Sequence, residues 1–530
     1  MLVVWYVLVF YFFLGLLVLL LPFGKWNYSF GFNDFFSFSF SFSSESCLFL
    51  FVLLMISFMI FVYASFYMFG TVRLFYFFLV LFSFVMSMGG LIMFSSSVLL
   101  TLVYWDFLGI SSFFLVLFYN NISGRCGAMS TVFTNRIGDF CIFLFFNGLI
   151  LFSLNCLSYQ FFCSLVGVML FVSAFIKGGQ YPFGSWLPKA MAAPTPVSCL
   201  VHSSTLVTAG VMLMDFYNYV SISFSGLVII FYVGFFTMFF ASCSALVEED
   251  AKKIVALSTM SQMGFCFLAI GCGFHYVSYI HMISHSFFKS LLFMQMGYLI
   301  FMNFGQQDYR GYSYVGLTGP VLVQLQVLLS VICLCGLLFT SGSCSKEYFM
   351  SCFYYSSFNF LLVFFYFIGI FLTFCYCYRM ICLFYVGFSG FDFPGFSSKL
   401  FYYSCFILVF FSVVFTFWWV LNLMSLPLNF NRFEFFVVFF YLFLLYCVFC
   451  WFMKYYVLEL KGKFFMDHYA RFIYKFILRF DYVEWFGISL NYFFFGFVRF
   501  FSFFFFSLFR GYYHLGLLIL VFFILFFIFF

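Results

Sequence analysis

Apolar stretches long enough to cross a lipid bilayer recur along almost the whole chain. A membrane-spanning helix needs about 20 consecutive apolar residues, and short polar breaks such as YNNISGR and NFGQQDYRGYS separate fifteen runs of this kind. The runs lie near 1–22, 46–69, 73–95, 97–118, 137–158, 161–178, 197–217, 224–247, 253–273, 276–301, 319–340, 357–380, 402–424, 433–453 and 511–530. This pattern predicts an all-α integral membrane protein with about 14–16 transmembrane helices.

The overall composition excludes a water-soluble protein. Hydrophobic residues make up 66% of the chain and charged residues only 7%, with a mean hydropathy of +1.17. A soluble domain carries about 25% charged residues, so a chain with this little charge needs the lipid bilayer as a partner. The net charge of +6 is spread thinly, and without a long basic block no nucleic-acid partner is expected.

Cysteine and glycine patterns give no sign of a bound cofactor. The 19 cysteines lie mostly in apolar runs, and their spacing does not fit zinc or iron–sulfur ligation. Free cysteine behaves as a small apolar residue, so we interpret them as membrane filler. No glycine-rich phosphate loop follows a strand pattern. We therefore expect no cofactor and no metal on this chain.

Two terminal segments have distinct patterns. The first apolar run lacks the basic start and small-residue cleavage site of a signal peptide, so we expect it to remain as a membrane span. Residues 459–510 mix charged and aromatic residues, and Arg471, Lys475 and Arg479 recur every four residues. This spacing is typical of a lateral amphipathic helix lying in the interface plane, and an ordinary extramembrane loop is the alternative.

A few ionisable residues lie inside the apolar runs, where charge is costly. His281, His285 and Lys289 are spaced at i, i+4 and i+8, which places them on one face of a helix. Such groups normally face a hydrated interior and form proton or ion paths. Histidine titrates near neutral pH, and a lysine in a low-dielectric interior releases its proton more readily than in water.

Two predicted helix breaks also carry charge. Lys177 ends an apolar run and is followed by GGQYPFGSWLP, whose glycines and prolines interrupt a helix. Lys346 follows CGLLFTSGSCS, where another apolar helix gives way to small polar residues. Two broken helices are typical of transporters built from inverted repeats. Asp106 and His202 are further ionisable groups in apolar surroundings, and a snorkelling side chain near a helix end is the alternative for any one of these residues.

Several sequence motifs resemble those of the antiporter-like subunits of respiratory complex I. The matching segments are KGGQYPFGSWLPKAMAAPTPVSCLVHSSTLVTAGV at 177–211, NRIGDF at 135–140, DAKKIVALSTMSQMGF at 250–265, HMISHSFFKSLLF at 281–293 and SKEYF at 345–349. The resemblance is strong from about 98 to 350. The terminal amphipathic stretch followed by one last span is similar to one particular member of that group of subunits.

The resemblance implies a role for each buried charge. Asp106 matches a family glutamate that pairs with the lysine at Lys177, and it shortens that side chain by one methylene. The other matched positions form a hydrated axis that ends at a distal lysine: His202, His281, His285, Lys289 and Lys346. We therefore expect Asp106 and Lys177 to form a charge pair across neighbouring helices.

The resemblance also implies a cellular setting and a division of the chain. It implies a proton-translocating subunit in the mitochondrial inner membrane, with NADH, FMN, iron–sulfur clusters and ubiquinone on other subunits. The lateral helix would brace antiporter-like neighbours in the membrane arm. The expected parts are N-terminal helices at 1–96, an antiporter-like core at 97–400, C-terminal helices at 401–458, the lateral helix at 459–510 and an anchor at 511–530. The region before residue 98 is shorter than in the family.

Two other functions fit parts of the sequence. A sodium/proton antiporter subunit carries the same motifs and would act without a redox partner. A structural membrane scaffold would use the buried charges only in ion pairs. For such a scaffold, neutralising Lys177 or Lys289 would disturb assembly and leave pumping unchanged.

Overall fold

The computed structural model describes most of the chain up to residue 415. The described residues are 26–30, 38–71, 73–95, 97–153, 166–217, 224–303, 305–308, 321–336, 340–355, 360–385 and 399–415. The chain divides into two compact units, Met1–Phe465 and Met466–Phe530. The second unit lies outside the described residues, as do the predicted runs at 1–22, 433–453 and 511–530 and the predicted lateral helix at 459–510.

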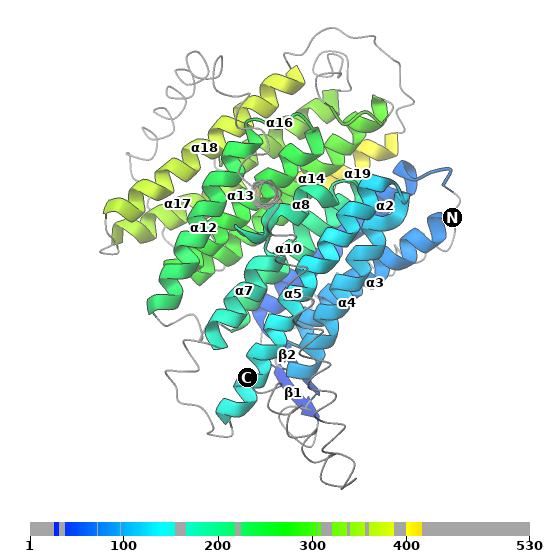
Figure 1. The fold of residues 1–530 in the computed structure, drawn as a ribbon. Helices are drawn as coiled ribbons and strands as arrows, with labels where there is room; N and C mark the ends of the chain where they lie inside the picture. The colour runs from blue at the N-terminus through cyan, green and yellow to red at the C-terminus, as the bar shows by residue number, and fades with distance from the viewer. Residues whose placement is uncertain are drawn as a thin grey trace, which may run out of the picture. The chain divides into compact units, whose positions relative to one another are not determined.

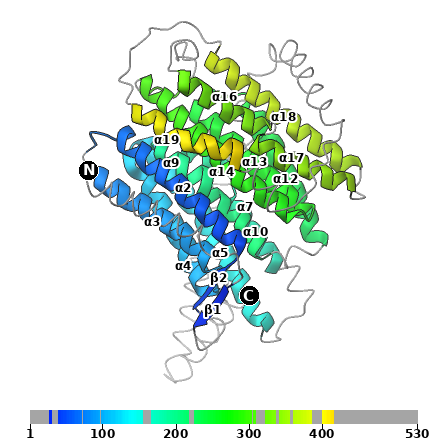
Figure 2. The ribbon, with the colours of Figure 1, turned by 180° about the vertical axis from the view of Figure 1, so that it is seen from behind.

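Helices dominate the described residues, and in the first unit they pack side by side as a bundle (Figures 1 and 2). The first half of the bundle contains α2 (Ser44–Tyr67), α3 (Leu74–Met93), α4 (Val98–Val116), η1 (Leu117–Tyr119), α5 (Ile122–Ser153), α7 (Gly167–Lys177), η3 (Phe183–Ser185), α8 (Trp186–Ala190), α9 (Thr195–Leu200), η4 (Val201–Thr205) and α10 (Leu206–Phe216). The second half contains α12 (Phe224–Ala245), α13 (Ala251–Gly271), α14 (His275–Met302), α16 (Val321–Cys335), α17 (Ser341–Tyr355), α18 (Phe360–Tyr385), α19 (Lys399–Phe410) and η6 (Phe411–Phe415). The predicted helical membrane fold is confirmed.

Seven helices within the described residues are long and apolar enough to cross a membrane. They are Glu45–Tyr67, Leu74–Met93, Val98–Tyr119, Thr195–Phe216, Gly226–Ala245, Ala251–Gly271 and Phe364–Ile381. Helix α14 has 28 residues and is therefore about 42 Å long, which is enough to cross as well. Its polar face accounts for its lower mean hydropathy, because the ionisable residues of the predicted stripe lie on it.

Helix α14 is the central element of the bundle. It packs against α2, α9, α13, α16, α17 and α19 (Figure 1). Every residue from Val277 to Ile300 is buried. This position explains how α14 can carry a polar face inside a membrane protein, because other helices shield that face from lipid.

Glycines allow α12 and α13 to pack closely. A Cβ on Gly234 would lie 2.6 Å from the backbone nitrogen of Leu268, and one on Gly271 would lie 2.5 Å from the backbone nitrogen of Phe231. Small residues let helix backbones approach in a membrane, where van der Waals contact drives helix association. Any larger residue at these two positions would push the helices apart.

Large apolar side chains cover the outward faces of α3, α4 and α5. Those exposed by more than half include Phe75, Tyr76, Met86, Phe107, Phe114, Phe133, Ile137 and Phe140. An exposed apolar belt of this kind suits contact with lipid tails or with other membrane subunits.

Both predicted helix breaks are present. Helix α7 ends at Lys177, and Gly179 follows with a φ of +62° in the left-handed region that favours glycine. Helix α16 ends at Cys335, and Gly336 has a φ of +80°. The second break differs from its prediction in position, because SGSCS forms the first turns of α17 and Lys346 lies inside that helix.

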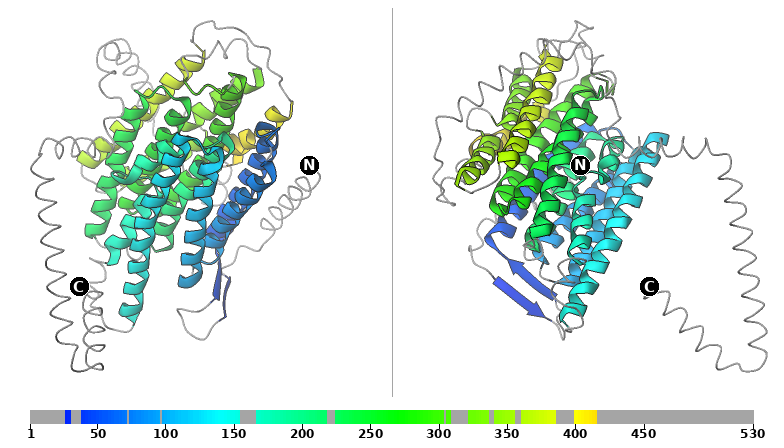
Figure 3. Two further views of the ribbon diagram at one scale, coloured as in Figure 1. Left: turned by 45° about the vertical axis from the view of Figure 1, so that its right-hand side comes forward. Right: turned by 60° about the vertical axis from the view of Figure 1, so that its left-hand side comes forward.

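A short β-hairpin departs from the all-α prediction. Strands β1 (Trp26–Phe30) and β2 (Phe38–Phe42) pair antiparallel, with Trp26 opposite Phe42. The hairpin lies at one end of the bundle, next to α2 and α3 (Figure 3). Helix α2 starts directly afterwards, and Ser43 and Ser46 form a reciprocal capping box at its first turn.

Candidate functional site

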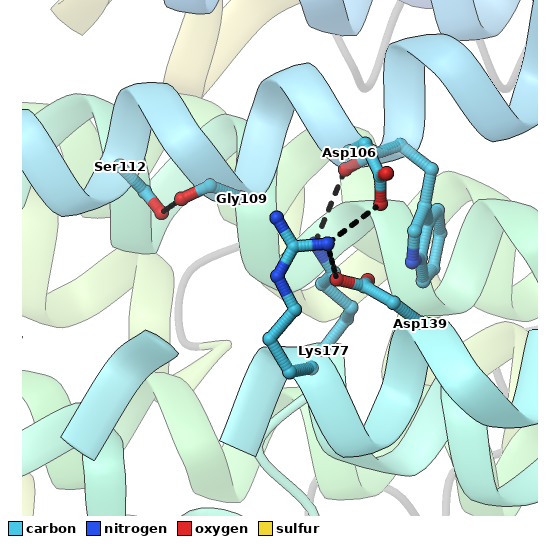
Figure 4. A network of polar contacts seen from close by, with 7 residues as sticks. Asp106, Gly109, Ser112, Asp139 and Lys177 are labelled. Atoms are coloured by element: carbon cyan, nitrogen blue, oxygen red, sulfur yellow. Dashed lines mark hydrogen bonds and ion pairs between the residues drawn. The ribbon is translucent and has the colours of Figure 1, made fainter. Parts of the chain in front are cut away.

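Lys177 stands at the end of α7 and is fully buried. Its Nζ atom donates a hydrogen bond to the backbone carbonyl of Trp105 on α4 at 3.4 Å, and it lies 4.8 Å from the centroid of the Trp105 ring (Figure 4). A Cβ on Gly109, one turn further along α4, would lie 3.6 Å from Nζ. The ammonium group therefore lies close against α4 at Gly109, where a Cβ would only make an ordinary contact with it.

Three charged residues lie beside Lys177: the two carboxylates of Asp106 and Asp139, and the guanidinium of Arg136 between them. We call this group the carboxylate cluster. Arg136 Nη1 lies 3.5 Å from Asp106 Oδ1 and 3.4 Å from Asp139 Oδ2, so the guanidinium bridges two carboxylates (Figure 4). The Asp139 side chain is 5% exposed, whereas those of Asp106 and Arg136 are 32% and 52% exposed. Both carboxylates interact electrostatically with Lys177.

The structure shows no direct ion pair between Asp106 and Lys177 among the described side chains, although the two charges interact electrostatically, so their pairing stays a prediction. Among the ion pairs of the described side chains, Asp106 contacts Arg136 instead. The motif NRIGDF marked the segment that contains Arg136 and Asp139, but the sequence analysis gave these two residues no role. Their spacing of three residues on a helix was the available signal, because it places both side chains on one face of α5.

His202 occupies an irregular turn between α9 and α10. The turn η4 has π-helical geometry, a feature that often occurs at functional sites. His202 is fully buried, and neither of its ring nitrogens has a hydrogen-bond partner among the described residues. Its ring lies 5.9 Å from that of Trp186, whose indole nitrogen donates to the carbonyl of Ile176, next to Lys177.

The stripe predicted on 276–301 lies on α14, where His281, His285 and Lys289 are all fully buried. Neither ring nitrogen of His285 has a hydrogen-bond partner among the described residues, although the backbone of Ser203 lies close to the ring. Lys289 donates to the hydroxyl of Ser258 on α13. His285 also interacts electrostatically with both Lys289 and His281.

His281 is held on both sides, unlike His285. Its Nδ1 atom is 2.8 Å from the hydroxyl of Ser345 on α17, and its Nε2 atom is 3.0 Å from Gln262 Oε1 on α13. Gln262 Nε2 donates to the hydroxyl of Tyr376 on α18 at 2.8 Å. The sequence analysis missed Ser345, Gln262 and Tyr376, because partners on separate helices leave no spacing signal in a single sequence.

Lys346 lies in α17 and bonds back across the second helix break to the end of α16. Its Nζ atom donates to the carbonyls of Leu334 at 2.9 Å and Cys335 at 3.0 Å. These two carbonyls end α16, where the helix dipole places partial negative charge. Lys346 also interacts electrostatically with His281 and Lys289 of the α14 stripe.

The arrangement suits proton transfer. We call six buried ionisable residues the polar row: Lys177, His202, His285, Lys289, His281 and Lys346. All belong to residue types that take up and release protons. Among the described residues there is no group of three or more histidine, cysteine or acidic side chains that could hold a metal ion, and the described cysteines are free thiols.

Comparison with known proteins identifies the class. A family model described as "NADH:quinone oxidoreductase/Mrp antiporter, TM" matches residues 95–373. The NADH-ubiquinone oxidoreductase chain 5 of Ascaris suum is 46% identical, over 79% of this chain and 76% of its own length. The corresponding protein of Caenorhabditis elegans is 43% identical over 79% of both chains.

Solved structures share the fold. A structure of the Mrp complex from a Dietzia species has a TM-score of 0.74 at 21% identity, covering 90% of this chain and 56% of that chain. A structure of an archaeal membrane-bound sulfane sulfur reductase has a TM-score of 0.67 at 18% identity, covering 84% of this chain and 79% of that chain.

The fold and the polar row define a membrane subunit of the antiporter-like class. The relatives and the family model then give the particular family: the chain belongs to the NADH-ubiquinone oxidoreductase chain 5 family.

Proposed function

We propose that the polar row carries protons in this chain, which is a proton-translocating membrane-arm subunit of NADH:ubiquinone oxidoreductase and a multi-pass protein of the mitochondrial inner membrane. Each residue of the row would hold or pass a proton. The carboxylate cluster at one end would set whether Lys177 keeps its proton.

The observation that carries this proposal is a pair of buried histidines, His202 and His285, whose ring nitrogens have no hydrogen-bond partner among the described residues. Leaving a buried polar group without a hydrogen bond costs about 1–3 kcal/mol, and in native proteins such groups bind ordered water. His202 and His285 would therefore each bind water. Since the backbone of Ser203 lies close to His285, the two water sites would lie near each other.

The remaining steps of the row follow existing contacts. Trp186 connects the end of α7 to His202, because it touches both the His202 ring and the Ile176 carbonyl. Beyond His285, the proton would pass to Lys289 or to His281. Ser345 bonds to His281 and directly precedes Lys346, so the row reaches the second break without leaving the buried interior.

Arg136 would act as the switch at the first break. While it bridges Asp106 and Asp139, it compensates the charge of both carboxylates. If its exposed side chain swings away, the buried carboxylate of Asp139 acts on the ammonium of Lys177 without competition. Lys177 would then hold its proton, and it would release the proton when Arg136 returns. Opposite charges favour the charged form of a buried group in this way.

This chain assembles with other membrane subunits. We propose further that antiporter-like neighbours of the membrane arm are among them and that the segment 459–510 braces them as a lateral helix. The redox steps would take place on other subunits, which would hold NADH, FMN, iron–sulfur clusters and ubiquinone. Deleting residues 459–530 should then release this subunit or loosen its neighbours, and an intact, fully coupled complex after the deletion would refute bracing.

A sodium/proton antiporter remains the alternative by fold. The match to the Mrp structure has only 21% identity and covers 56% of the Mrp chain. It therefore supports the fold alone. The relatives at 43% and 46% identity are chain 5 proteins of NADH-ubiquinone oxidoreductase. Proton translocation that required sodium and continued without NADH oxidation would favour the antiporter.

The proposal is tested by Lys289→Ala in the assembled complex. Protons translocated per NADH oxidised should fall much more than complex abundance, because the lysine is buried within the row. Lys253→Ala is the matched control, since Lys253 is 40% exposed and pairs with Asp250 outside the row. Equal loss of abundance and translocation in Lys289→Ala would indicate a scaffold instead.

A further inference from the structure

The polar face of α14 continues beyond the predicted stripe towards the start of the helix. His275 is the first residue of α14 and Ser278 follows one turn later. With His281, His285 and Lys289 they recur at intervals of three or four residues, so all five share one helix face. Ser278 is fully buried, whereas the His275 side chain is 28% exposed. The buried row therefore reaches a partly exposed histidine at this end.

A carboxylate from another helix meets that histidine. Asp215, near the end of α10, places Oδ1 3.4 Å from His275 Nδ1. Its side chain is 14% exposed, and its second oxygen is buried without a hydrogen-bond partner among the described residues. The pair thus has one side open to solvent and one unpartnered oxygen turned inward, where a water molecule can bind.

Other polar groups surround this pair. The side chain of Ser278 and the charge of Glu45 at the start of α2 both act on Asp215, as does the Cys266 thiol on α13. The hydroxyl of Tyr279 donates to the backbone carbonyl of Glu45 at 2.5 Å and so ties α2 to α14 at this end. Among the described residues, Glu45 and Asp215 give this end of α14 a negative charge that favours the approach of protons.

We propose that Asp215 and His275 form a proton-exchange site that connects water at one end of the bundle to the histidines of α14. The His275 imidazole takes a proton from water and becomes imidazolium, with Asp215 balancing the charge. It then gives that proton to a water held by Asp215 Oδ2 and Ser278, which passes it on along the polar face of α14, and the neutral imidazole is restored. This proposal rests on the proton-carrying role of the polar row.

A simple brace between α10 and α14 is the competing explanation. A partly exposed ion pair contributes little to stability, so a brace predicts small effects on abundance and none on proton transfer. The exchange site instead predicts a large loss of proton transfer and little change in abundance. It also predicts that a small soluble base can replace the missing imidazole, because His275 is reachable from solvent.

The test uses His275→Ala and Asp215→Asn in the assembled complex in sealed membranes. Both should lower protons translocated per NADH oxidised several-fold at near-normal abundance. Added imidazole should restore translocation in His275→Ala, but not in His285→Ala, whose site is fully buried. Tyr276→Phe is the control, since the neighbouring Tyr276 is 56% exposed and does not belong to the polar face.

The outcomes separate this inference from the function of the row. If Lys289→Ala stops translocation while His275→Ala and Asp215→Asn translocate normally, the exchange site is wrong and the row stands. A loss in His275→Ala that imidazole does not restore would also overturn the exchange site. If Lys289→Ala itself translocates normally, the row fails and the exchange site fails with it.

Discussion

The two helix breaks hold the same residue type in different electrostatic surroundings. At the first break, Lys177 lies beside two carboxylates and the half-exposed guanidinium of Arg136. At the second, the ammonium of Lys346 donates to two fixed carbonyls at the end of α16. Side chains can rearrange, but the carbonyls of a helix end cannot move independently of it. We infer that the first break switches and that the second provides a fixed position.

Among the changes that test this comparison, the largest loss of proton translocation is expected at Lys346. Lys346→Met should abolish translocation through this chain and also lower abundance, because two carbonyls lose their partner at about 1–3 kcal/mol. Lys346→Arg should recover abundance without translocation, since arginine keeps the donors but is not deprotonated in proteins. Blue-native quantification and proton-to-NADH ratios would measure both. Full recovery of translocation in Lys346→Arg would mean that Lys346 only positions the helix end.

A smaller effect is expected from Arg136→Gln. Stability should change by no more than about 1 kcal/mol, because Arg136 is 52% exposed. Translocation should fall, since the two carboxylates lose their bridge, and the loss should vanish in a Lys177→Met background. Arg125→Gln on the same helix is the matched control, because the hydrogen bonds of the Arg125 side chain within the described residues go to Asn120 in a loop. Independent losses in Arg136→Gln and Lys177→Met would break the proposed switch.

The smallest effect on translocation is expected from Gln262→Leu. This change removes one hydrogen bond to His281 and one to Tyr376, at a cost of about 1–3 kcal/mol in stability. Because His281 keeps its contact with Ser345, translocation should fall only in part. Tyr376→Phe should leave translocation unchanged, since it does not touch the histidine. Thermal unfolding of the complex would measure stability, and proton-to-NADH ratios would measure translocation. A larger loss of translocation in Tyr376→Phe than in Gln262→Leu would contradict the role of Gln262 at His281.

The sequence predicted the helices well because lipid imposes a simple rule on spanning segments. The predicted runs at 253–273 and 276–301 differ by only a few residues from α13 and α14, since a span must be apolar over its full length. The stripe on α14 was predictable for the same reason. Charges inside such a run stand out, and the helical period places them on one face.

Other features left weaker signals. The serines of SGSCS were expected to end a helix, but Ser343 and Ser345 donate their hydroxyls to carbonyls three residues earlier and so remain within α17. The strands β1 and β2 fall in a region that the search for long apolar runs passed over. The alternation of phenylalanine and serine in FSFSF, with its period of two, was the available signal.

The partners of the polar row could not be predicted from spacing. Arg136 and Asp139 fall outside the search for charges in apolar runs, because they lie before or at the start of the predicted run at 137–158 and only the extended α5 brings them beside Lys177. His275 was missed because it stands at a helix end, where a polar residue needs no explanation. The proposed role of His275 depends on its contact with Asp215, which lies 60 residues earlier in the chain.

The most direct measurement of the central claim compares His202→Phe, His285→Phe and the double variant in reconstituted membranes. If both histidines bind water along one path, each single change interrupts the same path, and the double change should cost little more than the worse single one. NADH oxidation with an uncoupler present should continue in all three. Strictly additive losses, or a normal proton-to-NADH ratio in His285→Phe, would contradict a proton path through the polar row.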